Sequence, residues 1–173
     1  ESANFQKVSY IGHAAFYSCK SLTSVNLPNL LSMSDAVFGF CRNLESVNFS
    51  KVDVIPDYAF EYCINLTTVN IPNAKFIGGH AFYACSALQS IDFQNVSFVE
   101  EHAFDDCSAL QSINLPNVWY VGNQGFADCM AIQSIDLPKV KYIGTYGMAY
   151  CTSLQSVNMP ALEYIQSYAF TGC

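Results

Sequence analysis

The stretch CSALQSINLPNVWYVGNQGFADC, residues 107–129, contains one complete period of this chain and decides its fold. It begins and ends on a cysteine, and all eight cysteines of the 173-residue chain recur every 22 residues, from Cys19 to Cys173. Seven identical spacings do not arise by chance, so the sequence predicts a tandem repeat. We expect a single array with a partial unit at 1–8, seven full units over 9–162 and a partial unit at 163–173, cut from a longer protein.

Two hydrophobic patterns follow one another within each unit. Phe104, Cys107 and Leu110 have the spacing of one face of a helix of about two turns. Farther along the unit the apolar residues alternate with polar ones, which indicates a short strand. The sequence therefore predicts helical turns near residues 79–85 and a strand near residues 90–93, repeated in every unit.

One unit is too small to bury its own apolar side chains, but stacked units can bury them against each other. Neighbouring strands then form a parallel sheet with about 4.8 Å between them. With strands on one side and bulkier helical turns on the other, the stack is expected to curve. The predicted fold is an α/β solenoid with the parallel β-sheet on its concave face and short helical turns on its convex face.

The pattern LxxIxLP at residues 110–116, followed by VG at 121–122 and FxxC at 126–129, resembles the BspA-like leucine-rich repeat. The resemblance covers the whole chain because the pattern recurs in every unit. It implies a leucine-rich-repeat solenoid from a secreted or cell-surface protein, and therefore an extracellular or cell-surface location. It also implies adhesion, or binding to a host or matrix protein, although members of the family bind widely different partners.

Composition and charge exclude several classes of protein. Apolar residues make up 51% of the chain and charged residues 12%, which excludes an intrinsically disordered chain. The excess of 14 acidic over 7 basic residues argues against a nucleic-acid partner. Apolar runs stay well short of the roughly 20 residues that span a bilayer, so this fragment is predicted to have no membrane span.

The sequence motifs predict no catalysis, cofactor or metal centre. The chain lacks CxxC pairs, nucleophile motifs and phosphate-binding loops, so it is predicted not to be an enzyme. The cysteines are predicted to form a buried ladder of reduced thiols. Equivalent side chains in neighbouring units are separated by about the distance between stacked strands, which is too far for a disulfide. The alternative is that some of them form disulfides. His80 and His102 share one unit position, so their rings could stack; a shared metal ion is the alternative interpretation.

Charge and aromatic residues indicate one candidate binding surface. Residues 76–138 contain seven carboxylates and no lysine or arginine, which suits a basic partner or a cation, or simply a solvated face. Aromatic residues recur at one unit position, either as a binding stripe or as a cover for the core edge. The predicted partner is a protein with a basic rim and an apolar centre. The candidate protein-binding residues are Phe98, Trp119, Tyr120, Tyr142, Asp105, Asp106 and Asp128.

Two functions fit these observations. The favoured one is a non-catalytic protein-recognition or adhesion module. The alternative is a structural spacer or a self-associating repeat array with no specific ligand. The predicted strand face is nearly uniform, so a specific epitope must lie at positions that differ between units.

Overall fold

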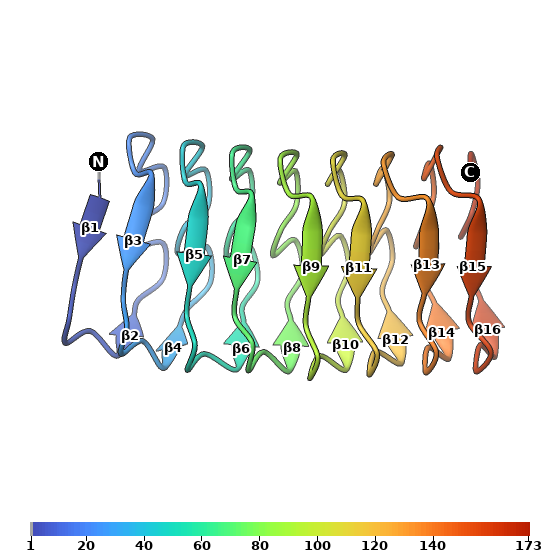
Figure 1. Ribbon diagram of the computed structural model, residues 1–173, viewed down its shortest axis with the longest axis horizontal. Helices are drawn as coiled ribbons and strands as arrows, with labels where there is room; N and C mark the ends of the chain where they lie inside the picture. The colour runs from blue at the N-terminus through green and yellow to red at the C-terminus, as the bar shows by residue number, and fades with distance from the viewer. Residues whose placement is uncertain (1) are drawn as a thin grey trace.

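The computed structural model describes residues 2–173, and in it the chain forms a parallel β-solenoid (Figure 1). Each rung, meaning one 22-residue turn of the solenoid, contributes a longer and a shorter strand. The longer strands are β1 (Ser2–Asn4), β3 (Ser24–Asn26), β5 (Ser46–Asn48), β7 (Thr68–Asn70), β9 (Ser90–Asp92), β11 (Ser112–Asn114), β13 (Ser134–Asp136) and β15 (Ser156–Asn158). The shorter strands are β2 (Tyr10–Ile11), β4 (Ser32–Met33), β6 (Val54–Ile55), β8 (Phe76–Ile77), β10 (Phe98–Val99), β12 (Tyr120–Val121), β14 (Tyr142–Ile143) and β16 (Tyr164–Ile165).

Both rows of strands are parallel and pair in a register of one repeat. Ser90 of β9 lies opposite Ser112 of β11, and Phe98 of β10 lies opposite Tyr120 of β12. The longer strands form three sheets, in the orders β1-β3-β5-β7, β9-β11 and β13-β15. The shorter strands form two sheets, in the orders β6-β8-β10-β12-β14-β16 and β2-β4. The predicted stacking of equivalent positions is confirmed, and the strand expected near residues 90–93 is β9. The row of shorter strands was not predicted.

The predicted helical turns are wrong, because the structure has no helix among residues 2–173. In the segment expected to be helical, backbone N–H groups alternate between two kinds of acceptor. Ala81 donates to the Gly78 carbonyl within its own rung at 3.3 Å, whereas Phe82 donates to the Ala103 carbonyl of the next rung at 2.8 Å. An α-helix would require every such group to bond four residues back along the same segment.

Left-handed backbone conformations produce this alternation. His80 and Ala84 have φ values of 56° and 58°, and the equivalent residues of the other rungs are also positive. These residues are among those whose N–H groups donate to the next rung, as His80 does to Glu101 and Ala84 to Asp105. The segment is therefore a stack of tight turns, which we call the turn edge: residues 12–18 and their equivalents 34–40, 56–62, 78–84, 100–106, 122–128, 144–150 and 166–172. The predicted concave placement of the strands depended on helical bulk and stays a prediction.

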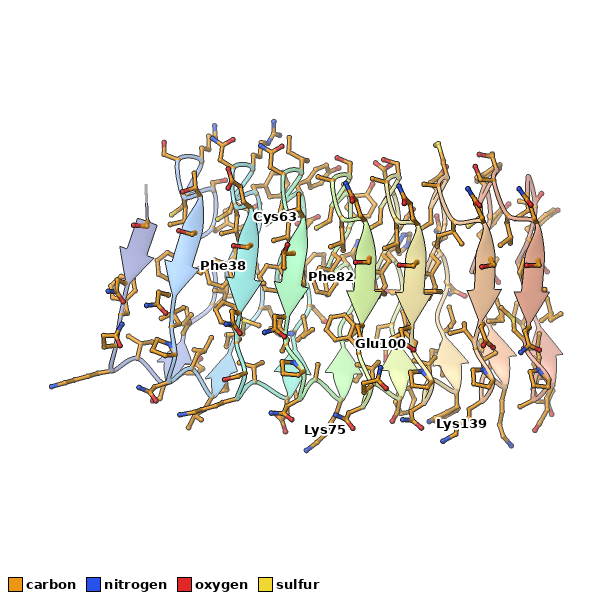
Figure 2. The ribbon with its side chains drawn as sticks, viewed as in Figure 1. Phe38, Cys63, Lys75, Phe82, Glu100 and Lys139 are labelled. Atoms are coloured by element: carbon orange, nitrogen blue, oxygen red, sulfur yellow. The ribbon has the colours of Figure 1, made fainter. Side chains whose placement is uncertain are left out.

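The core is a column of stacked phenylalanines that runs along the solenoid. Phe82 stacks on Phe60 at 5.3 Å and on Phe104 at 5.1 Å between ring centroids, and all three rings are fully buried. Figure 2 shows Phe38 and Phe82 inside the stack together with Cys63. The helix-like spacing in the sequence thus reports which residues of the tight turns face inward.

The cysteines form a second buried column, which confirms the predicted ladder of free thiols. All eight are unpaired; Cys41 to Cys151 are buried, Cys19 is half-buried and Cys173 is exposed. The Cys85 Sγ donates to the Phe60 carbonyl at 3.2 Å, and that carbonyl also accepts the N–H of Cys63 at 3.0 Å. A small side chain with a weak donor therefore satisfies a carbonyl of the preceding rung.

Thiol titration should separate the end cysteines from the buried ones. Burial raises the pKa of the Cys41 thiol to about 11 and that of Cys151 to about 12, so thiolate is scarce at neutral pH. In native buffer without reductant, we expect Cys173 and Cys19 to react with an aromatic disulfide reagent while the other six stay protected. In denaturant about eight thiols should react. Six or fewer would contradict the free-thiol ladder.

Candidate functional site

Four of the candidate residues form an aromatic cluster on the row of shorter strands. Phe98 of β10, Tyr120 of β12 and Tyr142 of β14 lie side by side because the strands pair one repeat apart. The centroids of Phe98 and Tyr120 are 5.9 Å apart, and those of Tyr120 and Tyr142 are 5.1 Å apart with nearly parallel rings. All three residues are half-buried, so their rings cover the strands and also reach solvent.

Trp119 extends this cluster into solvent. It immediately precedes β12, and its ring packs edge-on against Phe98 at 4.5 Å. The residue is 41% exposed, so it does not belong to the core. Its carbonyl accepts the backbone N–H of Lys141 at 2.9 Å, which holds the peptide between neighbouring rungs while the side chain projects outward.

Two carboxylates of the acidic stretch over residues 76–138 act on the aromatic cluster, Glu100 and Glu101. Burial raises the pKa of Tyr120, and Glu100 adds to this effect. Burial also raises the pKa of Glu100, and the negative charges of Asp57 and Glu101 raise it further. Both glutamates follow β10 and belong to the acidic stretch noted in the sequence, although neither was among the seven candidate protein-binding residues.

Lysines lie on the other side of the aromatic cluster. Lys141 is the rung neighbour of Trp119, and its Nζ lies 2.9 Å from the Glu163 Oε1. Figure 2 shows Lys75 and Lys139 pointing away from the stack at the edge near the shorter strands. The surroundings of the cluster are therefore mixed in charge rather than wholly acidic.

The remaining three candidate residues lie on the turn edge. Asp105 is buried, and its Oδ2 lies 2.8 Å from the Nδ1 of His102. Burial raises the pKa of Asp128, and the charge of Asp106 adds to it. Among the described residues, no ring contact, hydrogen bond or ion pair joins these carboxylates to the aromatic cluster. The structure thus places the seven candidates in two groups.

Possible metal ligands and a cavity near the first rungs are the features that bear on metal binding and catalysis. Within residues 2–173, no group of three or more histidine, cysteine or carboxylate side chains could hold a metal ion. A cavity of about 390 Å³ lies against the first rungs and is lined by Ser2, Ala3, Phe16, Cys19, Lys20, Ser21 and Leu22. Among the described residues that line this cavity there is neither a histidine nor a carboxylate to act as a base beside Cys19. Over the same described range, no helix has the length and apolar character needed to cross a membrane.

Replacing Trp119 should change the surface but not the stability. Because the ring is 41% exposed and contacts mainly Phe98, we expect Trp119→Ala to lower the free energy of unfolding by less than about 1 kcal/mol. The wild-type fluorescence should be red-shifted and quenched by iodide. A blue emission maximum, or a loss near 3 kcal/mol as for core tryptophans, would show that the ring is buried.

Comparison with known proteins identifies the repeat. The family model described as "BspA type Leucine rich repeat region" matches residues 1–99 and 75–173, with six copies. A leucine-rich repeat protein from Bacteroides ovatus is 26% identical over 99% of this chain, with a TM-score of 0.55; the match spans 58% of that protein's length. The Treponema pallidum leucine-rich repeat protein is 22% identical, with 91% of this chain and 68% of that one covered and a TM-score of 0.63.

A third solved structure is a leucine rich cell surface protein from Faecalibacterium prausnitzii. It is 21% identical, with all of this chain and 70% of that one covered, and the TM-score is 0.47. No curated protein matches the chain.

Proposed function

Because the chain belongs to the BspA-type leucine-rich repeat family, we propose that it is a protein-recognition or adhesion module of a secreted or cell-surface protein. A non-catalytic repeat module is supported by the leucine-rich-repeat family and by the solenoid fold. The extracellular location is part of the proposal and rests on the family.

The observation that carries the proposal is the aromatic cluster with Trp119 at its exposed end. Tryptophan and tyrosine dominate binding energy at protein interfaces, because they bury a large area at a small cost in side-chain entropy. The stacked rungs hold Phe98, Tyr120 and Tyr142 in fixed register, so a partner would meet a rigid surface. Glu100 on one side and Lys141 on the other would orient charged groups at the rim of that partner.

The alternative function, a spacer or self-associating array, is supported by the uniformity of the longer strands. The Asn70 Nδ2 donates a hydrogen bond to the Asn48 Oδ1 at 3.0 Å. In the same way, the Asn114 Nδ2 donates to the Asp92 Oδ1 at 3.1 Å. These repeated bonds use the side chains within the array and leave one face almost identical from rung to rung. Such a face is better suited to a spacer that holds other domains apart than to a site that recognises one specific partner.

Binding to immobilised matrix proteins tests the proposal. We would measure binding of the chain to fibronectin, laminin and collagen surfaces, and compare the double variant Trp119→Ala/Tyr120→Ala with Tyr10→Ala. Tyr10 occupies the same unit position as Tyr120 and is 61% exposed, but it lies outside the cluster. We expect saturable binding that the double variant weakens at least tenfold and Tyr10→Ala leaves unchanged. Absence of saturable binding, together with self-association in sedimentation velocity, would instead favour the alternative.

A further inference from the structure

A column of rings runs along the middle of the turn edge at one unit position. Tyr58 stacks on His80 at 4.9 Å, and His80 stacks on His102 at 4.5 Å with the two rings 11° from parallel. Gln124 follows at the same position in the next rung. The four residues share a left-handed backbone, with φ between 53° and 58°, so their side chains leave the chain in the same direction. The stacking of the two histidines confirms the sequence prediction.

The hydrogen bonds of His102 define where its proton lies. Its Nδ1 is 2.8 Å from the Asp105 Oδ2, and its Nε2 is 3.2 Å from the Gln124 Nε2. An amide nitrogen can only donate, so the His102 Nε2 accepts and carries no proton. The ring proton is therefore on Nδ1, which donates to the buried carboxylate of Asp105.

We propose that His80, His102 and Gln124 form a proton-operated switch on the turn edge. A proton from solvent adds to the His102 Nε2, and the new N–H then faces the NH₂ of Gln124. Because two donors cannot bond to each other, the Gln124 amide rotates by about half a turn and presents its Oε1 as the acceptor. The imidazolium keeps its Nδ1–H bond to the Asp105 carboxylate, and the two groups become an ion pair.

The stacked geometry disfavours a positive charge on both histidines at once. With the rings 4.5 Å apart, a charge on His102 opposes a second charge on His80. Burial lowers the pKa of His80, the charge of His102 lowers it further, and Glu101 and Asp57 act in the opposite direction. A charge on His102 therefore makes protonation of His80 less favourable.

The surroundings make this single charge significant. Tyr83 packs edge-on against both histidine rings, and Asp106 and Asp128 act on Asp105. The turn edge has no lysine or arginine in the part of the chain that the structure describes. Its carboxylates are Asp35, Asp57, Glu61, Glu100, Glu101, Asp105, Asp106 and Asp128. Protonation of His102 places a positive charge amid these carboxylates, so the net charge of the turn edge changes with the protonation state of the ring.

Nuclear magnetic resonance of the ¹⁵N-labelled chain tests the switch directly. At pH 7.5 the ring nitrogens of His102 should show a proton on Nδ1 and none on Nε2. On acidification, the Gln124 side-chain amide signals should shift together with protonation of the His102 ring. A proton on Nε2 at pH 7.5, or amide signals that do not follow the ring, would overturn the proposal.

Substitutions provide the second readout. His102→Gln should shift the His80 pKa upward, toward its ordinary value, because the neighbouring ring charge is removed. His13→Gln, on the turn edge but outside the column, should leave it unchanged. Both changes suit the fold, because Gln124 already has a φ of 53° against 54° at His102, and His13 lacks a positive φ. An unchanged His80 pKa in a folded His102→Gln variant would disprove the coupling.

Discussion

Phe82→Ala is expected to lower the free energy of unfolding by about 3–5 kcal/mol, which would make it a severely destabilising truncation. The ring is fully buried and stacks on Phe60 and Phe104, so its removal leaves a cavity that the rigid rungs cannot close. Urea unfolding followed by circular dichroism would measure the loss.

Two variants at the same unit position control this experiment. Phe16 is only half-buried, so Phe16→Ala should cost roughly half as much as Phe82→Ala. Phe82→Met should cost less than about 1.5 kcal/mol, because methionine fills most of the volume and Met148 already occupies the equivalent position. Equal losses for all three variants would contradict a continuous packed column.

Gly144→Ala should be the second most disruptive change, with a loss of about 1–3 kcal/mol from overpacking. A Cβ at this position would lie 2.6 Å from the backbone nitrogen of Asn123 and 2.6 Å from the carbonyl carbon of Gly122. Because both contacts are with backbone of the preceding rung, a side-chain rotation cannot relieve them. Thermal and urea unfolding of the variant would measure the effect.

Gly12→Ala is the matched control, because Gly12 occupies the same unit position. A Cβ there would meet nothing within 4 Å. We expect its stability to be unchanged or raised by up to about 1 kcal/mol, since alanine restricts the unfolded chain. If both glycine variants lost stability equally, the close approach of rungs at Gly144 would not be the cause.

The candidate surface was predictable only in part. Equivalent residues of consecutive units had to lie side by side, which correctly brought Phe98, Tyr120 and Tyr142 together. The repeat shows which residues share a unit position, but it does not show where each unit position lies around the rung. Asp105 was therefore grouped with the aromatic residues, whereas Glu100 and Glu101 are the carboxylates that affect Tyr120.

The 22-residue period alone determined that the chain is a solenoid with parallel strands in one-repeat register and a buried column of free cysteines. These features follow from repetition, because identical units bury their apolar side chains only against each other. Only the tertiary structure decided the backbone of the turn edge. There Phe82 bonds to Ala103 of the next rung, and residues such as His80 adopt positive φ to allow it. Apolar spacing reports which side chains face the core, but hydrogen bonds between rungs exist only once the rungs have stacked.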